Sequence, residues 1–235
     1  MPAAAHITPR LLPRLRAALK AAADPTRAAA MQAYMKSEMP YWGVSAPGVR
    51  AICRELFASY SFASAARWRA DVLSLWRSAQ RREERYAALA LAGHRKARPL
   101  QTLEALPMYE EMVVSGAWWD FVDVLASHQI GNLLELYPRE MRRTLRTWSR
   151  DDDLWKRRAA ILAQLGFGAA MDTKLLFACI RPSLASSEFF LRKAIGWALR
   201  QLARHRPDEV LRYVEEHAQQ LSPLSRREAL KHLRT

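Results

Sequence analysis

The chain has 235 residues, of which 50% are hydrophobic and 26% charged, with only 8 glycines and 12 prolines. This composition is typical of a globular protein and excludes a collagen-like or disordered chain. The charge is unusual, because 37 lysines and arginines against 23 acidic residues leave a net charge of +14. A polyanion such as nucleic acid is therefore the first partner to consider. An anionic membrane surface comes second, and a merely basic protein without such a partner is the plain alternative.

Cysteine and histidine usage limits the chemistry. Cys53 and Cys179 are the only cysteines, which excludes a disulfide framework and fits a reducing compartment, so we expect a cytoplasmic protein. The six histidines form no HxxxH pair and no CxxC is present, so we expect neither a metal nor another cofactor. The longest uncharged run, residues 159–171, is far shorter than the ~20 residues that span a bilayer, so no membrane partner is expected.

The first element is the N-terminal stretch MPAAAHITPRLLPRLRAALKAAA, which is rich in arginine and free of acidic residues. Thr8 followed by Pro9 predicts the start of an ordinary amphipathic helix, because threonine caps helices and proline suits their first position. An organelle transit peptide is the alternative for this stretch. Asp24 and Pro25 predict the start of the next helix by the same signal.

Helical periodicity continues along the rest of the chain. Apolar residues recur at i, i+3, i+4 and i+7 in 49–56 and again in 191–202. Ser225 and Glu228 predict a capping box at the start of the last helix. No segment of alternating apolar and polar residues is bounded by hairpin turns, so the sequence predicts an all-α protein.

Equivalent apolar positions repeat along the chain at intervals of 34 to 37 residues: Ile52, Leu89, Leu125, Ile161, Ile195 and Leu230. Further helical stretches lie between them at 68–80, 100–114, 133–148, 172–180 and 207–219. Two helices in each period of ~35 residues predict an α-solenoid of about six HEAT-like repeats, since the tetratricopeptide pattern is missing. No linker interrupts the array, so we expect a single domain over 1–235, with a concave basic groove.

The stretch SGAWWDFVD, residues 115–123, contains two adjacent tryptophans. On a helical wheel Trp118 shares an apolar stripe with Phe121 and is predicted to be core. Trp119 points about 100° away from Trp118 and lies one turn before Asp123 on the same face. One reading is that a partner helix covers Trp119 and that Asp123 is solvated or paired locally. The other reading is a functional aromatic next to a functional carboxylate.

Two later helices carry similar signals. In 189–204 the face opposite the apolar stripe combines aromatic and basic side chains, which suits phosphate contact together with stacking: Phe190, Lys193, Trp197, Arg200 and Arg204. In 154–165 the stripe contains Arg158, and a buried unpaired charge would cost several kcal/mol. Arg158 must therefore meet a carboxylate, reach an open groove or touch a phosphate.

Five segments together resemble the AlkD family of HEAT-like DNA glycosylases, over residues 33–233: AYMKSEMPYWGV, SGAWWDFVD, WKRRAAILAQL, EFFLRKAIGWALRQLA and LSPLSRREALKHL. The resemblance implies that Trp119, Asp123, Arg158 and Trp197 line a lesion site. It also implies that Tyr34, the tyrosine of the YMK segment, contacts DNA.

The resemblance further implies an activity, the removal of cationic alkylated bases such as N3-methyladenine and N7-methylguanine from duplex DNA. A cationic base needs no general acid to leave, so one carboxylate can suffice. In this reading Asp123, Trp119 and Trp197 are catalytic, and Arg158 holds a flanking phosphate. The sequence leaves the oligomeric state open, with a monomer as the working expectation.

Two alternatives come from other functional classes. The first is a nonenzymatic DNA-binding relative with the same fold and basic groove. The second is a HEAT-like scaffold for protein partners, which predicts an acidic or mixed groove and is disfavoured by the net charge of +14. Retention of all four residues of the lesion-site set disfavours the first.

Overall fold

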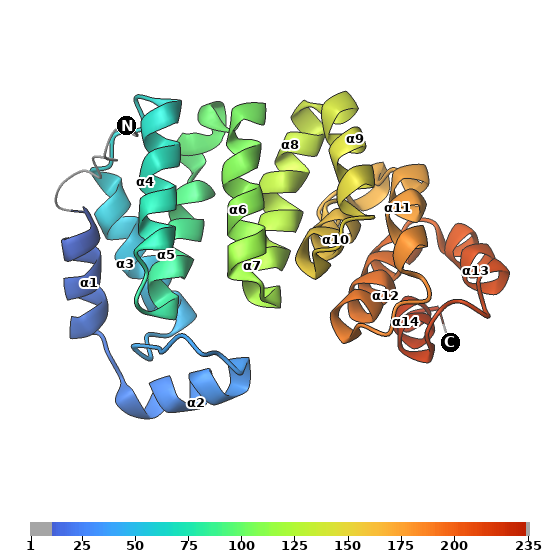
Figure 1. The fold of residues 1–235 in the computed structure, drawn as a ribbon, viewed down its shortest axis with the longest axis horizontal. Coiled ribbons are helices and arrows are strands. Elements are labelled where there is room, and N and C mark those ends of the chain that lie inside the picture. The colour runs from blue at the N-terminus through green and yellow to red at the C-terminus, as the bar shows by residue number, and fades with distance from the viewer. Residues whose placement is uncertain (1–10, 234–235) are drawn as a thin grey trace. The chain divides into compact units, whose positions relative to one another are not determined.

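The computed structural model describes residues 11–233, and within that range the protein is all-α, with fourteen α-helices and no strand (Figure 1). This confirms the predicted fold class. The chain divides into two compact units, with the boundary between Met108 and Tyr109. The predicted helix start at Thr8 and Pro9 lies outside the described residues.

The first unit contains five helices and two short 3-10 turns. The helices are α1 (Leu11–Ala21), α2 (Pro25–Met35), α3 (Ala46–Ala58), α4 (Ala65–Arg77) and α5 (Arg82–Ala92). The 3-10 turns Arg95–Leu100 and Leu103–Ala105 lead into α6 (Leu106–Gly116), which crosses the unit boundary. Helices α1, α3, α4 and α5 pack together, whereas α2 lies apart from them within this unit (Figure 1). As predicted, Asp24 caps α2 and Pro25 opens it.

A buried carboxylate anchors the loop that follows α2. Glu83 is fully buried and accepts hydrogen bonds from the backbone amides of Trp42, Gly43 and Val44, at 3.0, 2.8 and 3.1 Å. Gly43 has φ +82°, and a Cβ there would lie 2.0 Å from the carbonyl oxygen of Asp24. Because three donors satisfy the charge of Glu83, the loop is held firmly against α5.

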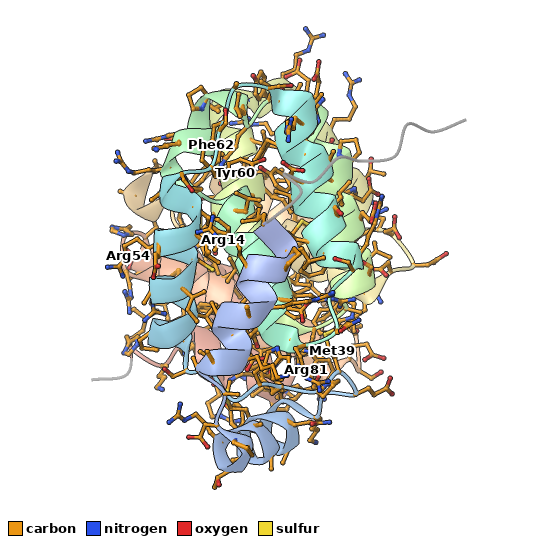
Figure 2. The ribbon with its side chains drawn as sticks, turned by 90° about the vertical axis from the view of Figure 1, so that its left-hand side faces the viewer. Arg14, Met39, Arg54, Tyr60, Phe62 and Arg81 are labelled. Carbon is orange, nitrogen blue, oxygen red and sulfur yellow. The ribbon has the colours of Figure 1, made fainter. Side chains whose placement is uncertain are left out.

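Aromatic packing closes the turn between α3 and α4. The rings of Tyr60 and Phe62 lie 4.7 Å apart, at the end of α3 in the view of Figure 2. The Tyr60 hydroxyl donates to the fully buried Asp71 of α4 at 2.7 Å. Burial raises the pKa of Asp71, and the hydrogen bond from Tyr60 opposes that shift. This pair therefore satisfies a buried polar group between two helices.

The second unit is built around α10 (Leu154–Leu162), which contacts helices on several sides. The other elements are α7 (Trp119–Val124), the π-helical turn Leu125–Ile130, α8 (Gly131–Leu136), α9 (Pro138–Trp148), α11 (Thr173–Ile180), α12 (Phe189–Ala203), α13 (Pro207–Glu216) and α14 (Pro223–Ala229), with short 3-10 turns at Gly168–Ala170 and Arg181–Ser183. Helix α10 packs against α7, α9, α11 and α12, and α12 packs closely along α14 (Figure 1).

The predicted core positions are confirmed except at Ile52, which is half-buried; the other five are buried. Several predicted helix boundaries are wrong, among them the start of 100–114, because α6 begins only at Leu106. The stretch 133–148 is two helices, because the chain turns at Tyr137 and Pro138 opens α9. The last helix is capped by Ser222, with Pro223 at its first position, rather than by Ser225. A single continuous repeat array over the whole chain stays a prediction.

Among the described residues, no helix combines the length and the apolar character that crossing a membrane requires.

Candidate functional site

A backbone break separates the two adjacent tryptophans. Helix α6 ends at Gly116, and Ala117 has a left-handed φ of +42°. Trp118 is extended, with φ −153° and ψ 148°, and is the N-cap residue of α7. The predicted wheel through 117–130 is therefore wrong at Trp118, which precedes the helix. Its half-buried indole packs instead against the rings of Trp155 and Phe190, with centroids 6.0 and 5.3 Å away.

Trp119 and Asp123 are the first and fifth residues of α7, so they lie one turn apart on one face, as predicted. The π-helical turn follows directly, and the Ser127 hydroxyl donates to the backbone oxygen of Asp123 at 2.6 Å. Such turns are rare and often occur at functional sites. Just beyond it, a Cβ on Gly131 would lie 2.7 Å from the carbonyl oxygen of Ala163, so only glycine permits this close approach to the end of α10.

Arg158 of α10 binds Asp123 through two parallel hydrogen bonds. Its Nε lies 2.7 Å from one carboxylate oxygen of Asp123, and its Nη2 lies 2.8 Å from the other. Its Nη1 donates to the backbone oxygen of Phe190. The side chains of Arg158 and Asp123 are only 5% and 14% exposed. Of the three alternatives that the sequence left for Arg158, the structure shows the carboxylate partner. The prediction that Arg158 contacts a phosphate gains no support from this geometry.

Burial and ion pairing shift the pKa of Asp123 in opposite directions. Burial raises the pKa of the Asp123 carboxyl, the guanidinium of Arg158 opposes that shift, and the nearby charge of Asp120 adds to it. The resulting pKa lies above the ordinary range of an aspartate. A carboxylate held in a buried site by one guanidinium is the kind of perturbed group that marks functional sites.

A cluster of three aromatic rings lies next to this ion pair and contacts it through Phe190. Trp118, Trp155 and Phe190 contact one another, and the Arg158 guanidinium lies 5.9 Å from the centre of the Phe190 ring. Phe190, predicted as a DNA contact, is thus half-buried in the cluster, whereas the neighbouring Phe189 is 53% exposed. Sequence reasoning missed Trp155 and Phe189, although both stand at helix starts beside residues that it had singled out.

The basic face of α12 is partly neutralised. Lys193 and Arg200 both bind Glu228 of α14, with Lys193 Nζ 2.9 Å from Oε1. Hydrogen bonding to Lys193 lowers the pKa of Glu228 more than any other contact, and the charge of Arg200 contributes as well. Gly196 lets α14 come this close, because a Cβ there would lie 2.9 Å from the carbonyl oxygen of Ser225. Lys193 and Arg200 thus already have a carboxylate partner, while Arg204 is exposed, and the contact of these three side chains with phosphate stays a prediction.

The remaining predicted residues are more accessible. Trp119 and Trp197 are half-buried, and within residues 11–233 neither indole takes part in a hydrogen bond or a ring contact. Tyr34 belongs to the first unit, where its side chain is 77% exposed on α2. Among the described residues, no group of three or more histidine, cysteine or acidic side chains is placed to hold a metal.

The fold and this site together define an all-α helical protein with a buried aspartate–arginine pair next to aromatic side chains. The structure is similar to that of a predicted DNA alkylation repair enzyme from Enterococcus faecalis, with a TM-score of 0.80 and 29% identity, over 91% of this chain and 97% of that one. The sequence profile of the DNA alkylation repair enzymes matches residues 15–233, and the chain belongs to this family. Comparison with curated proteins gives no match.

Proposed function

We propose that this member of the DNA alkylation repair family is a DNA glycosylase that hydrolyses the N-glycosidic bond of cationic alkylated purines in duplex DNA. N3-methyladenine and N7-methylguanine are the expected bases. The observation that carries the proposal is the buried Asp123–Arg158 pair, with Trp119 one helical turn away. That arrangement suits a reaction in which positive charge develops on a sugar.

The chemistry needs only one carboxylate. An alkylated purine already carries a positive charge, so when the bond to C1′ breaks, the electron pair moves to the base nitrogen and the base leaves neutral. The deoxyribose becomes oxocarbenium-like, water adds at C1′, and the water proton is lost to the carboxylate or to solvent. No general acid has to protonate the leaving group.

Asp123 is the group proposed to face the developing cation. Arg158 occupies one acceptor direction of each carboxylate oxygen, and the other lone pairs remain for a water or for the sugar. In this proposal Arg158 is a positioning residue: it orients the carboxylate and opposes the protonation that burial favours. Preorganised charge of this kind stabilises a transition state without reorganisation.

Trp119 and Trp197 are proposed to contribute through their ring faces. Neither indole is committed to another ring within the described part of the chain. A cation over an indole face is worth about 0.5–2 kcal/mol. Each tryptophan therefore supplies a smaller share of the rate than the carboxylate does.

Backbone contacts to DNA are proposed for exposed residues of both units. Arg204 and Phe189 are exposed on or beside α12, and Tyr34 is exposed on α2. Lys193 and Arg200 are both paired with Glu228. A phosphate can bind them either in addition to Glu228 or in its place. Phe190 supports the site from within the aromatic cluster.

The proposal is tested by Asp123→Asn, with Asp120→Asn as the matched control. An amide keeps the size of the side chain but removes the charge that faces the sugar. We expect single-turnover release of methylated bases to slow by roughly 100- to 1000-fold, as for other lost electrostatic contacts. Asp120→Asn should change the rate only mildly.

Duplex affinity and melting temperature must be measured on the same proteins. Asp123→Asn leaves Arg158 without its charged partner, so some loss of stability is expected. At a temperature where the variant is folded, duplex affinity should stay near that of the wild-type protein. A folded Asp123→Asn variant that excises at the wild-type rate would contradict the catalytic assignment.

A nonenzymatic DNA-binding role is the second candidate, and one observation favours it. Arg158 engages both oxygens of Asp123, which is also what a purely structural ion pair would do. That candidate predicts no base release by the wild-type protein. It also predicts that Asp123→Asn lowers stability and DNA affinity together.

A further inference from the structure

Helix α9 carries a row of arginines that the proposed function does not use. They recur at i, i+3, i+4, i+7 and i+11, so they lie on one face of the helix and of the turn after it. We call this set the arginine stripe; all five side chains are exposed: Arg139, Arg142, Arg143, Arg146 and Arg150.

The arginine stripe lines a hollow of about 780 Å³, together with Thr147, Asp151 and Asp152. None of the residues of the Asp123–Arg158 site lines it. The opposite side of α9 packs into the core, where Met141, Leu145 and Trp148 are buried. The hollow is therefore a separate surface with its own charge.

Most of the arginines in the stripe are available to bind a phosphate, because only one of them pairs with a carboxylate in the described residues. Arg142 pairs with Asp172 at 2.9 Å, and Arg150 donates to the backbone oxygen of Arg146. The acidic Asp151 is engaged by Lys156 at 2.6 Å. In the part of the chain that the structure describes, no carboxylate pairs with Arg139, Arg143 or Arg146.

We propose that the arginine stripe is a second binding site for the phosphate backbone of duplex DNA, separate from the lesion site. Guanidinium groups bind phosphates bidentately, and all five cations of the stripe are arginine. From Arg139 to Arg146 the stripe extends by about 10 Å along the helix axis, long enough to meet several charges of a duplex. The protein can then hold two duplex segments at once.

Other polyanions fit the hollow less well. A membrane-bound helix needs an apolar face to insert, and that of α9 is buried in the core. A single-strand site needs aromatic platforms, and the hollow has none among its lining residues. An acidic protein segment carries negative charge as DNA does, and the experiment below distinguishes these two partners.

The test is capture of a second duplex. An undamaged duplex is fixed to beads, wild-type protein is bound and washed, and a fluorescent second duplex is added over a range of salt concentrations. We expect capture by the wild-type protein. The triple variant R139Q/R143Q/R146Q should lose most of it, with a salt dependence shallower by about three in log–log slope, one for each lost phosphate contact.

Two further proteins make the result specific. R139K/R143K/R146K keeps the charge and should retain part of the capture. R95Q/K96Q/R98Q removes three exposed charges from a 3-10 turn of the first unit and should capture as the wild type does. The assay uses undamaged duplexes and does not score base release, so its result stands whether or not the protein excises bases.

Wild-type protein that captures no second duplex would overturn the proposal, and so would equal capture by R139Q/R143Q/R146Q. Polyglutamate and phosphatidylserine vesicles are added as competitors in the same assay. If the triple variant loses binding to either of these while duplex capture is unchanged, the site serves that partner and the duplex assignment is wrong.

Discussion

At the scale of single residues, Asp123 stands where burial and a neighbouring guanidinium oppose each other. Burial is the larger effect, and it raises the pKa of the carboxyl even though Arg158 binds both oxygens. The charge that the proposed reaction needs is therefore lost at a higher pH than for an ordinary aspartate. The adjacent Asp120 pushes the pKa in the same direction as burial.

This predicts a specific pH dependence. Excision should fall as the pH drops through the pKa of Asp123, because the protonated acid cannot stabilise a sugar cation. Asp120→Asn removes a negative charge that raises this pKa. The acid limb of the pH–rate profile should therefore move to lower pH. The measurement is the single-turnover excision rate at saturating enzyme over a range of pH, corrected for depurination without enzyme. An acid limb that stays in place or moves to higher pH would contradict the assignment.

The two adjacent tryptophans should differ in what they support. Trp119→Ala should slow excision by roughly 2- to 30-fold, the rate equivalent of one cation–π contact, with little change in melting temperature. Trp118→Ala should instead lower stability, because the contacts with Trp155 and Phe190 are worth about 0.5–1.5 kcal/mol each. Thermal unfolding and single-turnover excision on both variants separate the roles. The opposite pattern would reverse the assignment of the two rings.

At the scale of elements, α14 decides how much positive charge α12 presents. Gly196 allows the close approach, and Glu228 then binds Lys193 and Arg200. The sequence predicted both cations on one face of α12. It could not predict their partner, because Glu228 lies 35 residues from Lys193 and 28 from Arg200, and the sequence pattern assigns it to a capping box.

Glu228→Gln should therefore tighten duplex binding. Losing the carboxylate frees two cations for phosphates, so the salt dependence of binding should steepen by up to about two in log–log slope. The lowered pKa of Glu228 means that its ion pairs stabilise the folded protein at neutral pH and lose that effect as the pH falls through this pKa. The variant should accordingly melt at a lower temperature at pH 7.

Glu215→Gln, on the exposed face of α13, changes the net charge equally and serves as the control. It should leave both the affinity and the salt slope almost unchanged. Equal affinities for the two variants would mean that Lys193 and Arg200 do not contact DNA.

At the scale of the whole molecule, the net charge of +14 predicts electrostatic and largely sequence-independent binding. The logarithm of duplex affinity should fall steeply and linearly with the logarithm of salt concentration. Fluorescence anisotropy with two unrelated duplex sequences measures both properties. A flat salt dependence, or a strong preference for one undamaged sequence, would contradict binding through phosphates.

The sequence by itself determined the local features of this protein. Apolar periodicity predicted an all-α fold, and the one-turn spacing placed Trp119 and Asp123 on one face of a helix, because both depend only on neighbouring residues. The residue types and their motifs also pointed to the family, as the profile match over residues 15–233 confirms.

Only the tertiary structure decided which side chains contact one another at the candidate site. Three contacts join residues that lie far apart in the sequence: the bidentate pairing of Arg158 with Asp123, the packing of Trp118 against Trp155 and Phe190, and the ion pair of Lys193 with Glu228. Close backbone approaches and local breaks set these contacts: the left-handed Ala117, the π-helical turn, and the glycines at 131 and 196. A helical wheel treats each helix as straight and isolated, so it shows which face a side chain occupies but not which charge or ring it meets.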